Sequence, residues 1–251
     1  MKPPLDWCPY TKSEEKLHRI SLINMEYGEA QHQTHAAEII RKFLASKEKI
    51  SSELTSKGKK VLEIEDLDKS YDAKRIVDRV SMTLGRGVKI ALLGANGTGK
   101  TTLLKCINGE TNYTGSVQLG HNVNVTYFAQ DQADQLDKTK TVFETVDDIA
   151  KGDIRLKLRN ILGSFLFSQD DITKKVASLS GGEKTRLALC QLLLSPSNFL
   201  ILDEPTNHLD IASKNVLKQA LMTYEGTFIV VSHDRDFLQG LTNRIWDIKD
   251  K

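Results

Sequence analysis

The segment GANGTGKTT, from Gly94 to Thr102, has the spacing G-x-x-x-x-G-K-[ST] directly after an apolar run. Glycines at this spacing let the backbone curl so that successive N–H groups face an anion, and a following helix adds the positive end of its dipole. Lys100 has the reach to hold the β- and γ-phosphates of a nucleotide, and the Thr101 hydroxyl is a ligand for Mg²⁺. A glycine-rich turn alone would also fit a structural bend, but Lys-Thr in this place favours a nucleotide site. The residues predicted to form it are Gly94, Asn96, Gly97, Gly99, Lys100, Thr101 and Thr102.

Two adjacent carboxylates, Asp203 and Glu204, end the apolar run NFLILDEP. An acidic pair at the end of a strand is often only a turn, but a strand this apolar has no structural use for an Asp. Asp203 suits the holding of Mg²⁺, directly or through water, as in other phosphate-loop NTPases. Glu204 lies one residue further toward the carboxyl edge of the sheet, where ligands bind. It is placed to orient or deprotonate an attacking water.

The segment LSGGEKTR, from Leu179 to Arg186, predicts a second site for an anion. Ser180 is a good N-cap for a helix that starts near Gly182, and the turn offers exposed amides and a free hydroxyl. Two phosphate sites for one nucleotide make sense if the second one, formed by Ser180, Gly181 and Gly182, grips a nucleotide held by another domain of the same kind. With this segment the sequence resembles the ABC ATPase superfamily, over roughly residues 61–249.

This resemblance implies an ATP-binding cassette that binds Mg-ATP and hydrolyses it when two cassettes meet face to face. Tyr71 stands where such cassettes place an aromatic ring against adenine, and stacking of this kind contributes about 1–3 kcal/mol per base. The alternative for Tyr71 is an ordinary tyrosine at a strand end. Gln130 matches the Q-loop glutamine, His233 the switch histidine, and Asp210 the D-loop aspartate that reaches across to the other cassette. The implied catalytic residues are Glu204, His233 and Gln130, and the implied metal ligands are Thr101, Gln130 and Asp203.

The residues around these motifs resemble those of the ABC-F family. Members of that family carry two cassettes, and many of them act on ribosomes. The segments that carry this likeness are PTNHLD (205–210) and SHDRDFL (232–238). The short stretch from Gln130 to Ser180 lacks room for the arm insertion that first cassettes often carry, so the chain resembles a second cassette. It departs from the family in holding one cassette and in stopping at IWDIKDK, where members usually continue.

The resemblance therefore implies three kinds of partner. ATP is the substrate, a second cassette from another copy or a partner chain completes the site, and the ribosome or its RNA is the target. A membrane subunit is a less favoured partner, because it belongs to the alternative in which the chain is the ATPase subunit of a membrane transporter. A further alternative is a lone cassette that binds ATP without appreciable turnover.

The elements that must position these residues alternate between short β-like runs and helical patterns, which indicates an α/β domain with parallel strands. The fold class expected is an α/β P-loop NTPase of the ABC type, with a mixed sheet core, a small helical subdomain and an N-terminal helical arm. The cassette is expected to span residues 61–251, with its helical subdomain at about 133–195. Strands are predicted at 61–67, 88–94, 124–130, 198–204 and 226–232, and helices at 101–109, 183–194 and 213–224.

Residues 1–60 differ from the rest and predict a helical arm or linker. Apolar residues recur at helical spacing over 13–27 and 35–50, and the second segment has a basic opposite face. This arm is expected either to dock on its own domain or to touch another cassette or RNA phosphates. Residues 51–60 form a polar join.

Bulk properties exclude several classes of protein. The 251 residues include 35 basic and 33 acidic side chains, for a net charge of +2, so no strong global field favours nucleic acid or membrane. The three cysteines, Cys8, Cys106 and Cys190, are too far apart for a zinc motif and favour a reducing compartment. No apolar run approaches the ~20 residues of a spanning helix. These features predict a cytoplasmic protein.

Overall fold

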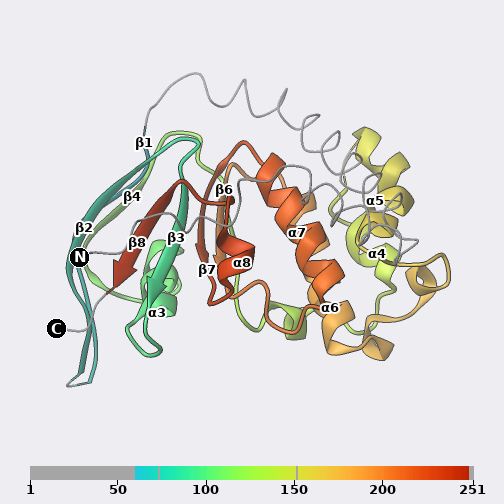
Figure 1. Ribbon diagram of the computed structural model, residues 1–251, viewed down its shortest axis with the longest axis horizontal. Coiled ribbons are helices and arrows are strands. Elements are labelled where there is room, and N and C mark those ends of the chain that lie inside the picture. Colours follow the sequence, from blue (N-terminus) through green and yellow to red (C-terminus); the bar gives the residue numbers. More distant parts are fainter. Residues whose placement is uncertain (1–59, 73, 151, 249–251) are drawn as a thin grey trace, which may run out of the picture.

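The computed structural model describes residues 60–248 apart from Ala73 and Lys151. Two sheets run through this part of the chain, and Figure 1 shows the smaller one at the left edge. The antiparallel sheet has the order β2-β1-β4, and the parallel sheet has the order β5-β6-β7-β3-β8. The strands are β1 (Lys60–Tyr71), β2 (Lys74–Gly85), β3 (Lys89–Gly94), β4 (Thr114–Leu119), β5 (Val125–Phe128), β6 (Phe199–Asp203), β7 (Thr227–Val231) and β8 (Arg244–Ile248).

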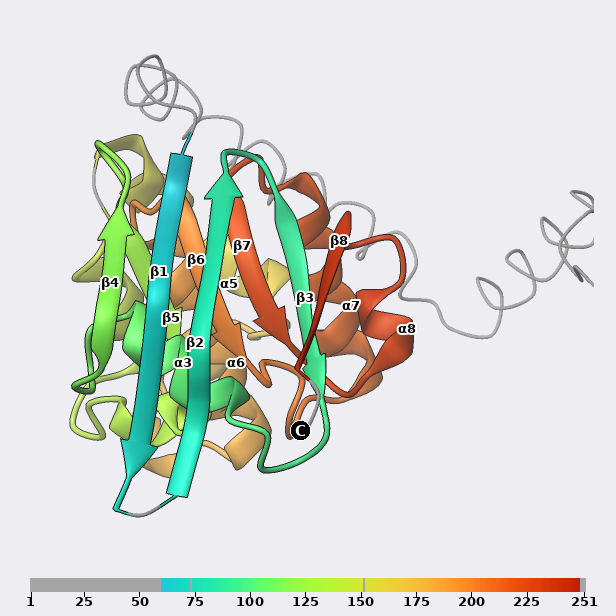
Figure 2. The ribbon, with the colours of Figure 1, turned by 90° about the vertical axis from the view of Figure 1, so that its left-hand side faces the viewer.

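Helices cover both faces of the parallel sheet. They are α3 (Lys100–Ile107), α4 (Val142–Asp147), α5 (Leu158–Ser164), α6 (Gly181–Leu194), α7 (Ile211–Thr223) and α8 (Arg235–Leu238). Short 3-10 helices lie at Gln132–Gln135, Gly152–Lys157, Asp171–Thr173 and Val176–Ser178. In Figure 2 the three antiparallel strands face the viewer, in front of α3 and the parallel sheet.

The expected α/β class is confirmed, with parallel and antiparallel pairing divided between the two sheets. All five predicted strands and all three predicted helices are present within one or a few residues of the expected ends. Three strands, β2, β4 and β8, were not predicted. Two of them, β2 and β4, flank β1 and complete the antiparallel sheet, and β8 adds an edge to the parallel one.

The two central strands β6 and β7 are buried at every residue, as a parallel sheet covered on both faces requires. Their side chains alternate between two cores. Phe199 and Ile201 pack into the core that α3 shares with β1, whereas Leu200 and Leu202 pack against α6 and α7. The ends of these strands are therefore fixed from both sides.

Helix α3 lies between the two sheets. Its buried residues Leu103, Leu104, Cys106 and Ile107 join the core that contains β1 and β3. Cys106 and, on α6, Cys190 are free and buried, and burial raises the pKa of both thiols. Both therefore serve as small apolar residues, the packing role that the spacing of the cysteines favours. Cys8 lies outside the described residues.

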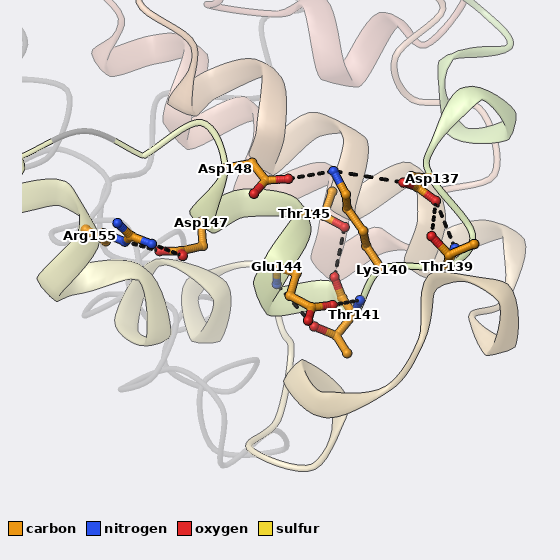
Figure 3. A network of polar contacts seen from close by, with 9 residues as sticks. All are labelled: Asp137, Thr139, Lys140, Thr141, Glu144, Thr145, Asp147, Asp148 and Arg155. Carbon is orange, nitrogen blue, oxygen red and sulfur yellow. Dashed lines mark hydrogen bonds and ion pairs between the residues drawn. The ribbon is translucent and has the colours of Figure 1, made fainter.

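The stretch predicted as a helical subdomain, 133–195, holds α4, α5, α6 and the 3-10 helices in its described part. Figure 3 shows how polar contacts fix the start of this stretch. Thr141 caps α4 in a reciprocal pair with Glu144, in which each side chain accepts a hydrogen bond from the other residue's backbone N–H. Lys140 forms an ion pair with Asp148 at 2.6 Å, and Arg155 pairs with Asp147.

Two expectations concern segments beyond these elements. The predicted arm at 1–60, with its helices at 13–27 and 35–50, lies outside the described residues except for Lys60. Within residues 60–248 no helix is long and apolar enough to cross a membrane.

Candidate nucleotide site

A pocket of about 510 Å³ lies where the parallel strands end, at the edge where open α/β sheets bind ligands. Strand β3 leads into the phosphate loop and α3, β6 ends at Asp203, and β7 is followed by His233. The volume is in the range of sites for small-molecule ligands. The pocket is lined by Tyr71, Ile76, Asn96, Gly97, Gly99, Lys100, Thr101, Thr102, Gln130, Asp203, Glu204, Asn207, Val231 and His233.

The loop before α3 uses its glycines where no other residue fits. Gly99 is the N-cap of α3 with a φ of 94°, and a Cβ there would lie 2.6 Å from Cγ2 of Ile76. Gly94 has a φ of 150°, and a Cβ there would lie 2.7 Å from the Ile248 carbonyl oxygen. The loop is therefore packed between β2 and β8, with its amides and the start of α3 at the pocket.

Lys100 is fixed inside this loop. Its Nζ donates hydrogen bonds of 2.8 Å to the carbonyl oxygens of both Gly94 and Ala95, and the residue is 8% exposed. The loop thus carries its cation in place beside the exposed backbone N–H groups. A polyanion such as a triphosphate is the ligand that this arrangement attracts.

Asp203 is 1% exposed at the end of β6, next to Thr101 on α3. Burial raises the pKa of the Asp203 carboxyl, and hydrogen bonds with the Thr101 and Tyr127 hydroxyls and the charge of Lys100 oppose that rise. Two of the three predicted metal ligands, Thr101 and Asp203, are therefore in contact although they lie on different elements. Their hard oxygen atoms, with the amide of Gln130 in the same pocket, suit a divalent cation such as Mg²⁺.

The described residues contain no group of three or more His, Cys, Asp or Glu side chains able to hold a metal alone. A site of few protein ligands matches the way Mg²⁺ binds with substrate phosphates.

Glu204 has an unusual backbone and an unpaired oxygen. Its φ is 49°, and its N–H donates to the Val231 carbonyl oxygen at 2.9 Å, which holds the turn against β7. Its Oε1 lies 3.4 Å from Nε2 of His233 without a hydrogen bond, and it is buried with no hydrogen-bond partner among the described residues. A buried carboxylate oxygen that faces a pocket in this way is suited to accept a hydrogen bond from water.

His233 and Tyr71 occupy the open sides of the pocket. The His233 side chain is 58% exposed, and its loop is anchored by Ser232, whose Oγ accepts a hydrogen bond from the Asp234 N–H and meets the Thr206 hydroxyl at 3.1 Å. Tyr71 ends β1 and is 46% exposed. Gln130, two residues after β5, is exposed at the same pocket.

Ser180 is the N-cap of α6, as expected, and the helix begins at Gly181. Its hydroxyl, expected to be free, instead donates to the Glu183 carboxylate at 2.7 Å and accepts a hydrogen bond from the Glu183 N–H. The Glu183 carboxylate also accepts a hydrogen bond from the Ser180 backbone N–H at 2.7 Å, and the two bonds that it accepts lower its pKa. The reason is the reciprocal cap that Ser and Glu form at this spacing. The hydroxyl must therefore leave Glu183 before it can meet a phosphate.

Asp210 caps α7, because its Oδ1 accepts a hydrogen bond from the Ser213 N–H at 2.7 Å. Its other oxygen pairs with Nη1 of Arg186 on α6 at 3.1 Å. Burial raises the pKa of Asp210, but the bonds from Ser213 and the charge of Arg186 outweigh it and hold that pKa low. The signature segment and the D-loop are thus joined within one chain, and a Cβ at Gly182 would lie 3.1 Å from the His208 carbonyl oxygen.

Eleven of the predicted residues therefore line one pocket, and the others lie elsewhere. Five predicted residues are not among the described residues that line this pocket: Gly94, Ser180, Gly181, Gly182 and Asp210. Three lining residues were not predicted. Asn207 lies inside PTNHLD and Val231 lies directly before SHDRDFL, so the motifs could have indicated both. Ile76 lies on β2, which was not predicted as a strand.

A P-loop fold in which an antiparallel sheet covers the loop's helix, and a serine-capped helix lies apart from its own pocket, is that of an ATP-binding cassette. The family model described as "ABC transporter" matches residues 77–207, slightly more than half of the chain. The chain belongs to this family.

Curated relatives confirm the likeness to the ABC-F group. The chain is 46% identical to "ABC transporter F family member 5" of Arabidopsis thaliana over 195 residues, which cover 77% of this chain and 28% of that protein. It is 47% identical to "Putative ATP-binding protein YdiF" of Bacillus subtilis over 193 residues (76% and 30%). It is 37% identical to "ATP-binding protein Uup" of Escherichia coli over 244 residues (94% and 36%). The chain spans about a third of the length of these relatives.

Solved structures support the fold. A dimeric, post-hydrolysis state of an ATP-binding cassette bound to ADP and phosphate matches with a TM-score of 0.65 at 20% identity, covering 74% of this chain and 94% of that one. An ATP-binding subunit of an ABC transporter matches with a TM-score of 0.66 at 21% identity.

Proposed function

We propose that this chain binds Mg-ATP in the described pocket and hydrolyses it when a second cassette closes over the nucleotide. The proposal rests on one observation: the motif residues of the predicted site do not all line the same pocket. The phosphate loop, Asp203 and Glu204 share one pocket, whereas Ser180 and its glycines lie outside it. One cassette thus has the parts that hold ATP and lacks, in that pocket, the segment that would grip the γ-phosphate from the other side.

The chain's own residues supply positioning and charge. Lys100 exchanges the carbonyl oxygens of Gly94 and Ala95 for the β- and γ-phosphates, and the amides of the loop hold the same oxygens. Mg²⁺, for which Thr101, Gln130 and Asp203 are the fitting ligands, supplies neutralisation of phosphate charge when bound. The unpaired Oε1 of Glu204 accepts a hydrogen bond from the attacking water and takes its proton as the water attacks. His233 orients a γ-phosphate oxygen from the open side.

The second cassette supplies Ser180, Gly181 and Gly182, with Asp210 beside them. Rotation of the Ser180 hydroxyl away from Glu183 leaves the first amides of α6 and that hydroxyl directed at the γ-phosphate of the facing cassette. After hydrolysis this contact is lost, and the pair reopens. The second cassette is either another copy of this chain or a partner chain.

The variant Glu204→Gln tests the catalytic role. Because Gln accepts no proton from water, turnover of Mg-ATP is expected to fall about 10²–10⁴-fold, with ATP binding retained and a closed, ATP-loaded pair accumulating. The measurements are phosphate release and size-exclusion chromatography with Mg-ATP. Glu65→Gln, on the exposed face of β1, is the matched control and should hydrolyse at the parent rate. A Glu204→Gln chain with parent turnover would remove Glu204 from the mechanism.

For the cellular role we propose a cytoplasmic ABC-F type factor that acts on the ribosome. The relatives named as F family members support it, as do the PTNHLD and SHDRDFL segments. Co-sedimentation of the Glu204→Gln chain with ribosomes is expected with Mg-ATP and not with ADP. Absence of pelleting in both states would favour a lone cassette that needs a partner, and recovery with a spanning subunit from membranes would favour a transporter ATPase.

A further inference from the structure

A buried lysine lies beneath the tyrosine that faces the nucleotide pocket. Lys69 precedes Tyr71 by two residues on β1, so both side chains point to the same face of the strand. The residue is 6% exposed, and its Nζ lies 4.5 Å from the centroid of the Tyr71 ring. This distance is within the range of a cation–π interaction.

The described partners of the Lys69 ammonium are both neutral. Nζ donates a hydrogen bond to Oδ1 of Asn112, on the segment between α3 and β4, and otherwise faces the ring. An ammonium group removed from water needs compensation, and an aromatic face with one amide oxygen supplies it in part. Lysine thus places a positive charge, and not only an aliphatic stem, against the Tyr71 ring.

The Tyr71 ring has two faces with different surroundings. One face carries Lys69, and Tyr71 as a whole residue remains 46% exposed and lines the pocket with Ile76. An aromatic ring bears negative charge on both faces, and a cation on one face draws π density toward itself. The other face then repels an electron-rich purine less, and the ring is fixed in one orientation.

We propose that Lys69 is a positioning residue for the adenine base, acting through Tyr71. The inference rests on the proposed function, in which Tyr71 is the adenine platform. It predicts that the ammonium strengthens binding of a nucleotide and leaves binding of a ligand without a base unchanged.

The test compares Mg-ATP with Mg-tripolyphosphate, which has the phosphates but neither ribose nor base. Binding of both ligands is measured by calorimetry for the parent, Lys69→Met, Lys69→Arg, Tyr71→Leu and the double variant Lys69→Met/Tyr71→Leu. Lys69→Met keeps an unbranched side chain, one heavy atom shorter, and removes the charge. Lys60→Met, an exposed lysine at the start of the same strand, is the matched control and should leave both affinities unchanged.

Lys69→Met is expected to weaken Mg-ATP binding about three- to tenfold and to leave tripolyphosphate binding within about twofold. Lys69→Arg should restore most of the affinity, because a guanidinium also stacks on an aromatic ring. In the Tyr71→Leu background the Lys69→Met change should cost nothing further, because the ring through which Lys69 acts is gone.

Three results would overturn the inference, and they are distinguishable. Equal weakening of both ligands by Lys69→Met would mean that Lys69 only supports the fold. Unchanged ATP affinity in Lys69→Met, with a large loss in Tyr71→Leu, would leave the adenine platform standing and remove Lys69 from it. Unchanged ATP affinity in Tyr71→Leu would remove the platform itself.

Discussion

At the residue scale, Asp203 and Glu204 are neighbours in sequence with different surroundings. Asp203 is buried among hydroxyl groups and beside Lys100, whereas Glu204 turns out of the strand and keeps one oxygen without a hydrogen bond, 3.4 Å from Nε2 of His233. These surroundings fit the proposed roles, in which Asp203 holds Mg²⁺ and Glu204 activates water. The turn at the end of β6 produces this division, since Asp203 is the last residue of the strand and Glu204 has a left-handed backbone with a φ of 49°.

The raised pKa of Asp203 predicts that this residue destabilises the fold without ligand. Because the native state binds the proton more tightly than the unfolded chain, ionised Asp203 costs stability above its native pKa, and the cost disappears as the pH falls toward the ordinary value of 3.8. Asp203→Asn should therefore raise the Tm measured at about pH 7, while Mg-dependent ATP binding is lost.

Calorimetric unfolding without nucleotide, at neutral and mildly acidic pH, measures this effect. The advantage of Asp203→Asn should shrink as the pH is lowered, and the exposed Asp134→Asn should show neither change. A neutral-pH Tm of the Asn variant below that of the parent would mean that the hydroxyls and Lys100 outweigh desolvation.

The sequence predicts residues well where chemistry imposes a spacing. Lys100, Thr101 and Glu204 were predicted from their motifs and line the pocket, because the G-x-x-x-x-G-K-[ST] spacing and the end of an apolar strand each fix a residue at the carboxyl edge of the sheet. Lys69 and Ile76 do not follow, since the contact of Lys69 with the Tyr71 ring and the place of Ile76 in the pocket depend on how the β1–β2 hairpin packs against the phosphate loop. The hydrogen bond between the Ser180 hydroxyl and Glu183 could have been predicted from the sequence, because Glu183 stands at the capping-box position.

At the element scale, α6 and α7 are joined by Arg186. Its guanidinium contacts Asp210 and the Ser213 hydroxyl at the start of α7, and lies 5.5 Å from the centroid of the Phe167 ring. Its side chain is 15% exposed, and its Nε is buried without a partner in the described structure. The helix that offers Ser180 to a facing cassette is therefore tied to the loop that carries Asp210, so the two should move together.

Arg186→Met is expected to loosen this link. Loss of the Arg186 guanidinium, which is hydrogen-bonded to the partly exposed Asp210 carboxylate, should lower the free energy of unfolding by about 1–2 kcal/mol. Urea denaturation measures this change. Arg186→Lys should not restore it, because an ammonium does not stack on the Phe167 ring as a planar guanidinium does. Lys184→Met on the same helix is the control, and equal losses in both variants would contradict the assignment.

Strands were predictable where both faces are buried. Strands β6 and β7 are apolar at nearly every position, and that run was visible in the sequence. Strand β2 carries Asp78 and Arg79 and is mostly half-exposed, β4 has no fully buried residue, and β8 is an edge strand with exposed positions. Their pairing with β1 and β3 comes from tertiary contacts that a local pattern does not contain.

At the scale of the whole molecule, the composite site can be tested by mixing inactive chains. Lys100→Ala removes the phosphate-holding cation, and Ser180→Arg blocks the surface offered to a facing cassette. Each variant alone should be inactive as a pair with itself. A mixed pair has one intact site, which combines the phosphate loop of the Ser180→Arg chain with the α6 turn of the Lys100→Ala chain.

An equal mixture should therefore recover about a quarter of the parent rate if chains pair at random and sites act independently. Phosphate release at several protein concentrations measures it, with the parent rate rising more than linearly at low concentration. If light scattering shows that the mixture forms pairs but no activity is recovered, the result would contradict a site shared between two copies. It would favour a partner chain as the second cassette.

The positive φ of Glu204 has an evolutionary consequence. A side chain in the left-handed region costs about 1–2 kcal/mol relative to glycine, and Asn and Asp tolerate it better than Glu. If Glu204 acts as proposed, hydrolysis is the function that favours glutamate at 204 against its backbone preference. In a lineage where such a cassette still binds ATP but no longer needs to cleave it, we expect position 204 to drift to Gly, Asn or Asp while Lys100 and the loop glycines persist. The identity of residue 204 would then record, in any descendant, whether turnover is still under selection.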